Sequence, residues 1–240
     1  MFELKECESI FQKALKDGRS SLLIQEAQQI CKLHGIPTPV SYVVQNVEEA
    51  VTKGNQMGFP VVLKIISPQI LHKSDVGAVV LDIDGEASLK EAYPKLVAEV
   101  RKNDPEAEVL GVLIEKMMPP STEVIVGGIR DSQFGPSIMF GMGGIFTEVY
   151  EDVAFRVAPI DKIDALNLIH ELRGSKILEG IRGKPPADLD AIADVLLNVS
   201  TLMLQHSAIS QLDLNPVIAY PDAVCAVDAR IVLAQNSGGV

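Results

Sequence analysis

Apolar and polar positions follow two different periods along the chain, and the two alternate. Apolar residues spaced by three or four positions predict helix over the first 35 residues, from the capping box Ser88-Leu89-Lys90-Glu91 to Val100, over 161–172 and over 188–205. Short runs rich in β-branched residues lie between these segments and predict strands. The predicted strands are 40–44, 61–66, 78–83, 111–115, 123–129, 137–141, 154–158, 208–214 and 224–232.

This order of elements predicts an α+β protein with two lobes. The first lobe covers 37–112 and the second 113–235, with a helical segment at 1–36 packed on the second lobe and a frayed tail at 236–240. A doubly wound sheet is the alternative, because strands and helices alternate there too. However, no G-x-G-x-x-G follows the first strand and no G-x-x-x-x-G-K-[ST] occurs, so a phosphate would have to be held in another way.

The net charge of −11 narrows the choice of partner. It argues against nucleic acid, which needs a basic face, whereas a nucleotide needs only a few cations, N–H groups and a metal. The composition is 47% hydrophobic and 22% charged, as in globular proteins, and no apolar run reaches the roughly 20 residues of a membrane span. Cys7, Cys31 and Cys225 show no metal-ligand spacing, so we expect buried, reduced thiols in a cytoplasmic protein.

Two basic residues and a histidine are candidates for phosphate chemistry. Lys64 interrupts an apolar run and must reach solvent, an ion pair or a ligand, although an edge-strand lysine facing water explains it equally well. The loop 71–77 contains His72 and Lys73. Lys73 supplies charge for a phosphate, and histidine is a competent nucleophile toward phosphoryl groups. By composition alone, a polar turn is the favoured interpretation of this loop.

Two glutamates flank a connection that Pro119-Pro120 keeps extended. Backbone groups near Met118 would then be available to a purine edge, between Glu115 at the end of one strand and Glu123 at the start of the next. Solvated strand ends are the alternative for both glutamates.

A glycine-dense segment and an arginine add weaker signals. The segment 141–144 has the composition of an anion-binding nest or of a tight connection. Arg156 interrupts a later strand, and its guanidinium could point at a phosphate.

Polar residues near the end of the chain predict a magnesium site. Asp213 and Asn215 are two positions apart on a predicted strand and so share one face, while Asp228 interrupts the neighbouring strand. Oxygen ligands converging from adjacent strands suit Mg²⁺. Surface charges that keep the strands soluble are the alternative.

Taken in order, these segments resemble the ATP-grasp (beta) subunit of ADP-forming acetyl-CoA and acyl-CoA synthetases, relatives of succinyl-CoA synthetase. The resemblance runs from about Gly35 to Leu233 and rests on six motifs. They are Val61-Val62-Leu63-Lys64-Ile65, His72-Lys73-Ser74-Asp75-Val76-Gly77, Glu115-Lys116-Met117-Met118, Gly141-Met142-Gly143-Gly144, Leu212-Asp213-Leu214-Asn215-Pro216-Val217 and Val227-Asp228-Ala229-Arg230.

The resemblance implies an ATP-grasp fold whose two lobes clamp ATP or ADP with Mg²⁺, and a role for each candidate residue. The implied nucleotide contacts are Lys64 at the phosphates and Glu115 with Met118 at adenine and ribose, with Glu123 nearby. The implied magnesium ligands are Asn215 and Asp228, with Asp213 beside them. His72 is implied to carry phosphate transiently, and Arg156 to steady a phosphate.

The resemblance also implies a partner. The chain has no CoA-binding Rossmann domain, so CoA, acid and phosphate would be bound by or with an alpha subunit that carries a phosphorylated histidine, in an α2β2 heterotetramer. The implied reaction is acyl-CoA + ADP + phosphate ⇌ acid + CoA + ATP. Succinyl-CoA synthetases have a glycine-rich stretch where this chain has His72-Lys73-Ser74-Asp75, so their phosphate-loop details do not transfer. The alternatives are a stand-alone ATP-grasp ligase that forms an acyl phosphate and a non-catalytic nucleotide-sensing subunit.

Overall fold

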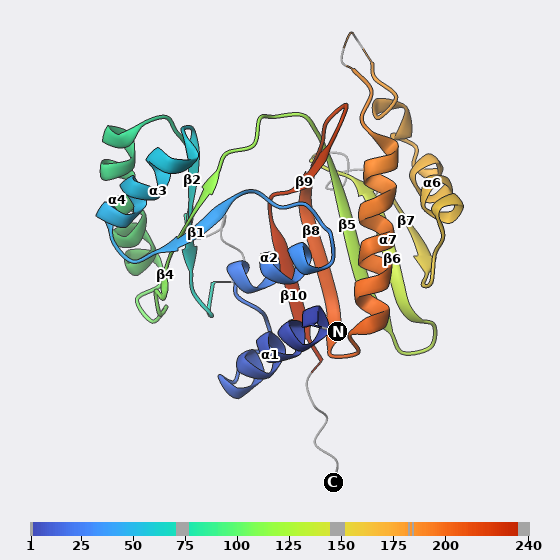
Figure 1. Ribbon diagram of the computed structural model, residues 1–240, viewed down its shortest axis with the longest axis horizontal. Coiled ribbons are helices and arrows are strands. Elements are labelled where there is room, and N and C mark those ends of the chain that lie inside the picture. Colours follow the sequence, from blue (N-terminus) through green and yellow to red (C-terminus); the bar gives the residue numbers. More distant parts are fainter. Residues whose placement is uncertain (1, 71–76, 145–151, 182, 184, 235–240) are drawn as a thin grey trace. The chain divides into compact units, whose positions relative to one another are not determined.

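The chain folds into two compact units, and a computed structural model describes residues 2–70, 77–144, 152–181, 183 and 185–234 (Figure 1). Unit 1 comprises Met1–Thr38 and Pro120–Val240, and unit 2 comprises Pro39–Pro119. Each unit is a mixed α+β body with one sheet of its own. The predicted α+β architecture with two lobes is therefore confirmed.

Unit 2 is a four-stranded antiparallel sheet with two helices on one face. The strand order is β1-β4-β2-β3. Residues 61, 63 and 65 of β2 point into a core shared with Leu89 and Leu96 of α4, whereas residues 62, 64 and 66 point to the other face. The elements are β1 (Ser41–Val44), α3 (Val47–Met57), β2 (Val61–Ile66), β3 (Val79–Ile83), α4 (Glu86–Asn103) and β4 (Gly111–Lys116).

Unit 1 is built on a larger antiparallel sheet in the order β10-β8-β5-β6-β7, with β9 paired to β8. The strands are β5 (Thr122–Asp131), β6 (Gly135–Met142), β7 (Val153–Val157), β8 (Ile209–Ala219), β9 (Val224–Ala226) and β10 (Ala229–Leu233). The helices are α1 (Phe2–Lys16), α2 (Ile24–Leu33), α6 (Lys162–Glu171), the 3-10 turn η1 (Ser175–Ile177) and α7 (Leu189–Gln205).

Helix α7 packs across the middle of this sheet, on β5 and β6 (Figure 1). Val124 and Val126 of β5 share the core with Val199 and Met203 of α7. A Cβ atom at Gly128 would lie 2.8 Å from Met203 Cγ, so glycine permits this close approach of helix and strand. The opposite face of the sheet carries Gly127 and Ile129 of β5 and, on β8, Asp213.

The boundary between the units differs from the predicted one. Residues 113–119 were expected in the second lobe, which corresponds to unit 1. They belong instead to unit 2, which corresponds to the first lobe, because β4 pairs with β1 and β2. The helical segment at the start belongs to unit 1, as expected. The predicted tail at 236–240 lies outside the described residues. Within the described ranges, no helix has both the length and the apolar character needed to cross a bilayer.

Candidate functional site

Lys64 and Glu115 form a buried ion pair in unit 2. The Lys64 Nζ atom lies 2.5 Å from Glu115 Oε1, and the two side chains are 8% and 2% exposed. Lys64 is opposite Leu113 and Glu115 is opposite Val62, so the pair lies diagonally on one face of adjacent strands. Because β2 is an inner strand and both residues are buried, the edge-strand alternative for Lys64 and the solvated-end alternative for Glu115 are wrong.

A second lysine, which the sequence analysis gave no role, stabilises the end of β4. The Lys116 ammonium donates to the carbonyl oxygens of Gly58 at 2.9 Å and Phe59 at 3.1 Å. The Met117 N–H donates to Pro60 O at 3.2 Å. Met118 follows directly and is half-buried. These contacts fix the backbone that leads into the predicted purine-binding turn. His72 and Lys73, the predicted phosphate-loop residues, lie outside the described residues.

Asn215 and Asp228, the predicted magnesium ligands, and Asp213 beside them lie at neighbouring backbone positions in unit 1. The Asn215 N–H donates to Asp228 O at 3.3 Å, which holds these two residues side by side. Asp228 falls between β9 and β10, and its Oδ1 accepts from Ala229 N at 3.2 Å. Asp213 precedes Asn215 by two positions in β8. The backbone therefore places three residues with oxygen-bearing side chains at neighbouring positions, and such oxygens are the hard donors that Mg²⁺ prefers.

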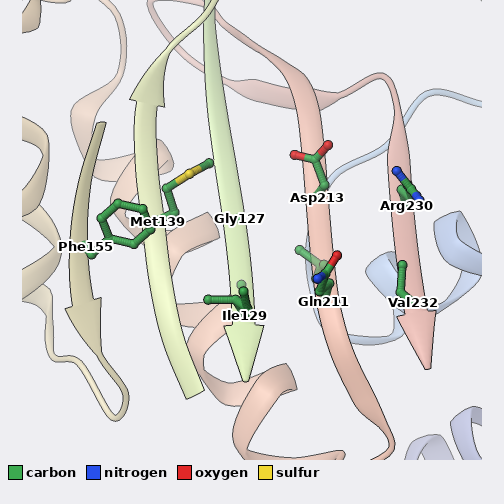
Figure 2. Close-up of a pocket in the computed structure, with 10 residues that line it drawn as sticks. Gly127, Ile129, Met139, Phe155, Gln211, Asp213, Arg230 and Val232 are labelled. Atoms are coloured by element: carbon green, nitrogen blue, oxygen red, sulfur yellow. The ribbon is translucent and has the colours of Figure 1, made fainter. Parts of the chain in front are cut away.

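Asp213 also lines a shallow pocket of about 390 Å³ on the sheet face away from α7. Figure 2 shows Asp213 on β8 beside Arg230 on β10, with Met139 and Phe155 on the strands across the sheet. Asp213 and Arg230 are direct cross-strand partners. Arg230 and Gln211 were missed as neighbours of Asp213, although the two-residue alternation of a strand places Gln211 on the same face.

Glu123 and the glycine-rich segment meet at the start of β5. The Gly143 N–H donates to Glu123 O at 2.8 Å, and a Cβ atom at Gly143 would lie 2.8 Å from Glu123 backbone and Cβ atoms. Close packing thus accounts for glycine at 143. The Glu123 side chain is exposed.

Arg156 does not line the pocket that Asp213 lines. Its Nη2 lies 2.6 Å from Glu171 Oε2 at the end of α6. Its neighbour Phe155 lines the pocket, and successive residues of a strand face opposite ways, so Arg156 lies on the other face of the sheet. We therefore leave Arg156 out of the proposed phosphate contacts.

Comparison with known proteins identifies the family of the chain. A family model described as an ATP-grasp domain matches residues 13–233. The chain is 46% identical over 233 residues to the acetate–CoA ligase (ADP-forming) I subunit beta of Pyrococcus furiosus, covering 97% of this chain and 100% of the relative. It is 42% identical over 234 residues to acetate–CoA ligase (ADP-forming) I of Archaeoglobus fulgidus, covering 98% of this chain but 34% of that longer relative.

A solved structure extends the likeness to three dimensions. It is the dinucleotide-forming acetyl-coenzyme A synthetase 1 of Candidatus Korarchaeum cryptofilum with coenzyme A and Mg-AMPPCP, whose phosphohistidine segment points towards its nucleotide binding site. The TM-score is 0.84 at 41% identity, over 95% of this chain and 100% of that chain. The chain therefore belongs to the ATP-grasp family, among the beta subunits of ADP-forming acetate–CoA ligases.

Proposed function

We propose that this chain is the nucleotide-binding subunit of an enzyme that catalyses acyl-CoA + ADP + phosphate ⇌ acid + CoA + ATP. The observation that carries the proposal is that three residues with oxygen donors, Asp213, Asn215 and Asp228, lie at neighbouring backbone positions in a chain of the ATP-grasp family. The relative from Pyrococcus furiosus is named as the beta subunit of such an enzyme, and this chain matches its whole length.

Asn215 and Asp228 are the proposed ligands of Mg²⁺, with Asp213 beside them. The donor set fits this ion, because magnesium takes carboxylate and amide oxygens and keeps its remaining positions for water and substrate phosphates. When bound, the ion would neutralise charge on the phosphates during transfer. The backbone hydrogen bond between Asn215 and Asp228 supports this assignment, because it holds the two residues next to each other.

Lys64 is the proposed contact to the nucleotide phosphates, and Glu115 has two proposed tasks. Its carboxylate orients the Lys64 ammonium, as the 2.5 Å contact supports. With Met118 and Glu123 it would also hold adenine and ribose. An ammonium already held in place contributes more to binding than one that must be ordered when the nucleotide arrives, because the entropy of its side chain is already lost.

His72 is the proposed phosphate carrier, with Lys73 beside it in the phosphate loop. In the forward direction, a phosphorylated histidine of the alpha subunit would transfer its phosphoryl group to a His72 nitrogen, and ADP would then take it to form ATP. The first transfer breaks the P–N bond on the alpha subunit and forms a P–N bond at His72. The second breaks the P–N bond at His72 and forms a P–O bond to ADP. The phosphohistidine segment of the solved relative supports a relay of this kind. The proposed assembly is α2β2 and cytoplasmic.

The two alternatives receive less support. A stand-alone ligase would need its own site for the acid, whereas this chain corresponds to the beta subunit alone of the Pyrococcus furiosus enzyme. A nucleotide sensor without chemistry would have no use for His72 in the phosphate loop.

Binding of nucleotide to the purified chain tests the proposal. We expect Mg·ADP at about 100 times its Kd to stabilise the chain by roughly 2.7 kcal/mol, or about 5–10 °C in melting temperature. Asn215→Ala and Asp228→Ala should lose the part of this shift that depends on magnesium. Asp222→Ala is the matched control, because Asp222 is exposed in the turn before β9. A full magnesium-dependent shift in both site variants would show that these residues do not hold the ion.

A further inference from the structure

Three side chains with metal-ligating atoms meet in unit 1, at positions that lie far apart in the sequence. Cys7 comes from α1, His34 follows the end of α2, and His206 follows the end of α7. Their ligating atoms lie within 4.8 Å of one another, and the two histidine Nε2 atoms are 3.1 Å apart. Figure 1 shows α1 and α2 beside the C-terminal end of α7. None of the three residues belongs to the proposed nucleotide site.

The histidine His34 is already oriented as a ligand. Its Nδ1 lies 3.1 Å from Ile30 O, and because a carbonyl oxygen only accepts, Nδ1 carries the proton. In the neutral ring, the Nε2 lone pair then faces His206. Metal-binding histidines are held in the same way, by donating their other N–H to a carbonyl or carboxylate.

The surroundings of the two histidines favour a bound cation. Both histidines directly follow helix C-termini, where the helix dipole favours positive charge. His206 is 6% exposed, and the Phe11 ring packs edge-on against it at 5.3 Å between ring centroids.

The donor set selects the class of ion. One sulfur and two imidazole nitrogens suit Zn²⁺ and similar transition metals rather than the hard ion Mg²⁺. Tetrahedral zinc with Zn–N bonds of about 2.0–2.1 Å places two nitrogens roughly 3.3 Å apart, close to the 3.1 Å observed between the histidine Nε2 atoms. His34 is half-buried, so the cluster lies close to solvent on the side of this residue.

We propose that Cys7, His34 and His206 bind a zinc-type ion that ties α1 to the ends of α2 and α7. Binding replaces the Cys7 thiol proton, so one proton is released for each ion bound. The site is structural and independent of the nucleotide. It couples the first helix of the chain to the C-terminal end of the helix that packs across the sheet.

Titration of the metal-free full chain with Co²⁺, followed by competition with Zn²⁺, tests the proposal. We expect one ion per chain, with visible bands typical of tetrahedral cobalt and a near-ultraviolet sulfur-to-cobalt band, all displaced by zinc. Cys7→Ser should remove the sulfur band. His34→Gln should weaken binding by more than the roughly 10–100-fold that loss of an outer partner costs.

Two variants serve as matched controls. Cys225→Ser changes another buried cysteine, and His170→Gln changes an exposed histidine, so both should bind cobalt as the wild type does. Absence of saturable cobalt or zinc binding in the wild-type chain would overturn the proposal, whether or not any variant folds. Binding that survives both Cys7→Ser and His34→Gln, with the sulfur band intact, would overturn it as well.

Discussion

At the scale of single residues, the Lys64–Glu115 pair has a large effect because both charges are buried. Removing one partner from a buried pair leaves a charge without compensation, whereas replacing both with apolar groups is often neutral. A loss of nucleotide binding in Lys64→Ala alone would therefore be ambiguous, since the variant would also leave Glu115 buried and charged.

We expect Lys64→Met to destabilise the chain by about 3–5 kcal/mol, because the buried Glu115 carboxylate loses its partner. The double variant Lys64→Met with Glu115→Leu should recover most of that loss but still bind Mg·ADP weakly. Chemical denaturation measures the first effect, and calorimetric titration measures the second. Equal stability of the single and double variants would show that the two charges are not coupled.

The histidine pair predicts a dependence of stability on pH. Burial and His34 lower the pKa of His206 in the folded state below the ordinary imidazole value of 6.5. The unfolded chain therefore binds this proton more readily than the folded chain. The stability that the neutral His206 contributes is present above about pH 6.5 and is lost as the pH falls through that value toward the folded pKa. In the presence of a metal chelator, the free energy of unfolding of His206→Gln should fall less steeply below pH 6.5 than that of the wild type. His170→Gln should behave as the wild type does. The same slope in wild type and His206→Gln would assign the fall to other groups.

At the scale of elements, Arg130 connects β5 to the end of α7. Its guanidinium donates to three backbone carbonyl oxygens, at 2.5 Å to Met203, 3.1 Å to His206 and 3.1 Å to Ile209. The last carbonyls of a helix lack partners within the helix, so this side chain satisfies groups that would otherwise need water.

Loss of this side chain should therefore be costly. We expect Arg130→Met to destabilise the chain by about 2–4 kcal/mol, as hydrogen bonds from a charged donor to buried carbonyls are lost together. Arg101→Met is the control, because Arg101 is exposed on α4 and should change stability by less than about 0.5 kcal/mol. The midpoint of urea denaturation separates the two variants, and a similarly small change in both would refute the role of Arg130.

The element pattern was largely predictable, and its errors have local causes. Helix α3 was missed because Gly54 and few large apolar residues weaken its periodicity, although Asn46 and Glu49 form the cap that could have identified it. α4 begins at Glu86, so Ser88 is its third residue and hydrogen-bonds back to Gly85 rather than starting the helix. The strand expected at 224–232 is divided into β9 and β10 near Asp228.

The candidate site was predictable residue by residue but not as a set of contacts. Lys64 stood out as a polar residue in an apolar run and Glu115 as the residue at the end of a strand, but their pairing depends on β2 lying next to β4, a non-local contact. Arg156 stood out for the same reason, yet its partner Glu171 lies on a helix that strand periodicity cannot indicate. The cluster of Cys7, His34 and His206 could not be predicted, because its members lie far apart in the sequence and no short spacing connects them.

At the scale of the whole molecule, the proposed nucleotide contacts belong to both units, and the chain matches the full length of a beta subunit. We expect His72→Ala to abolish net ATP formation with the alpha subunit while Mg·ADP binding stays near that of the wild type. His170→Ala, at an exposed position on α6, should retain activity. Steady-state ATP synthesis and nucleotide titration together measure both effects, and full turnover by His72→Ala would exclude the relay.

The most direct test of the central claim is ATP formation from acetyl-CoA, ADP and phosphate by this chain, by a CoA-binding alpha subunit from the same source, and by the two together. We expect that neither chain alone forms ATP and that the mixture does so only with magnesium. Turnover by this chain alone would show a stand-alone ligase. A mixture that assembles and binds Mg·ADP yet forms no ATP would contradict the assignment as a catalytic beta subunit.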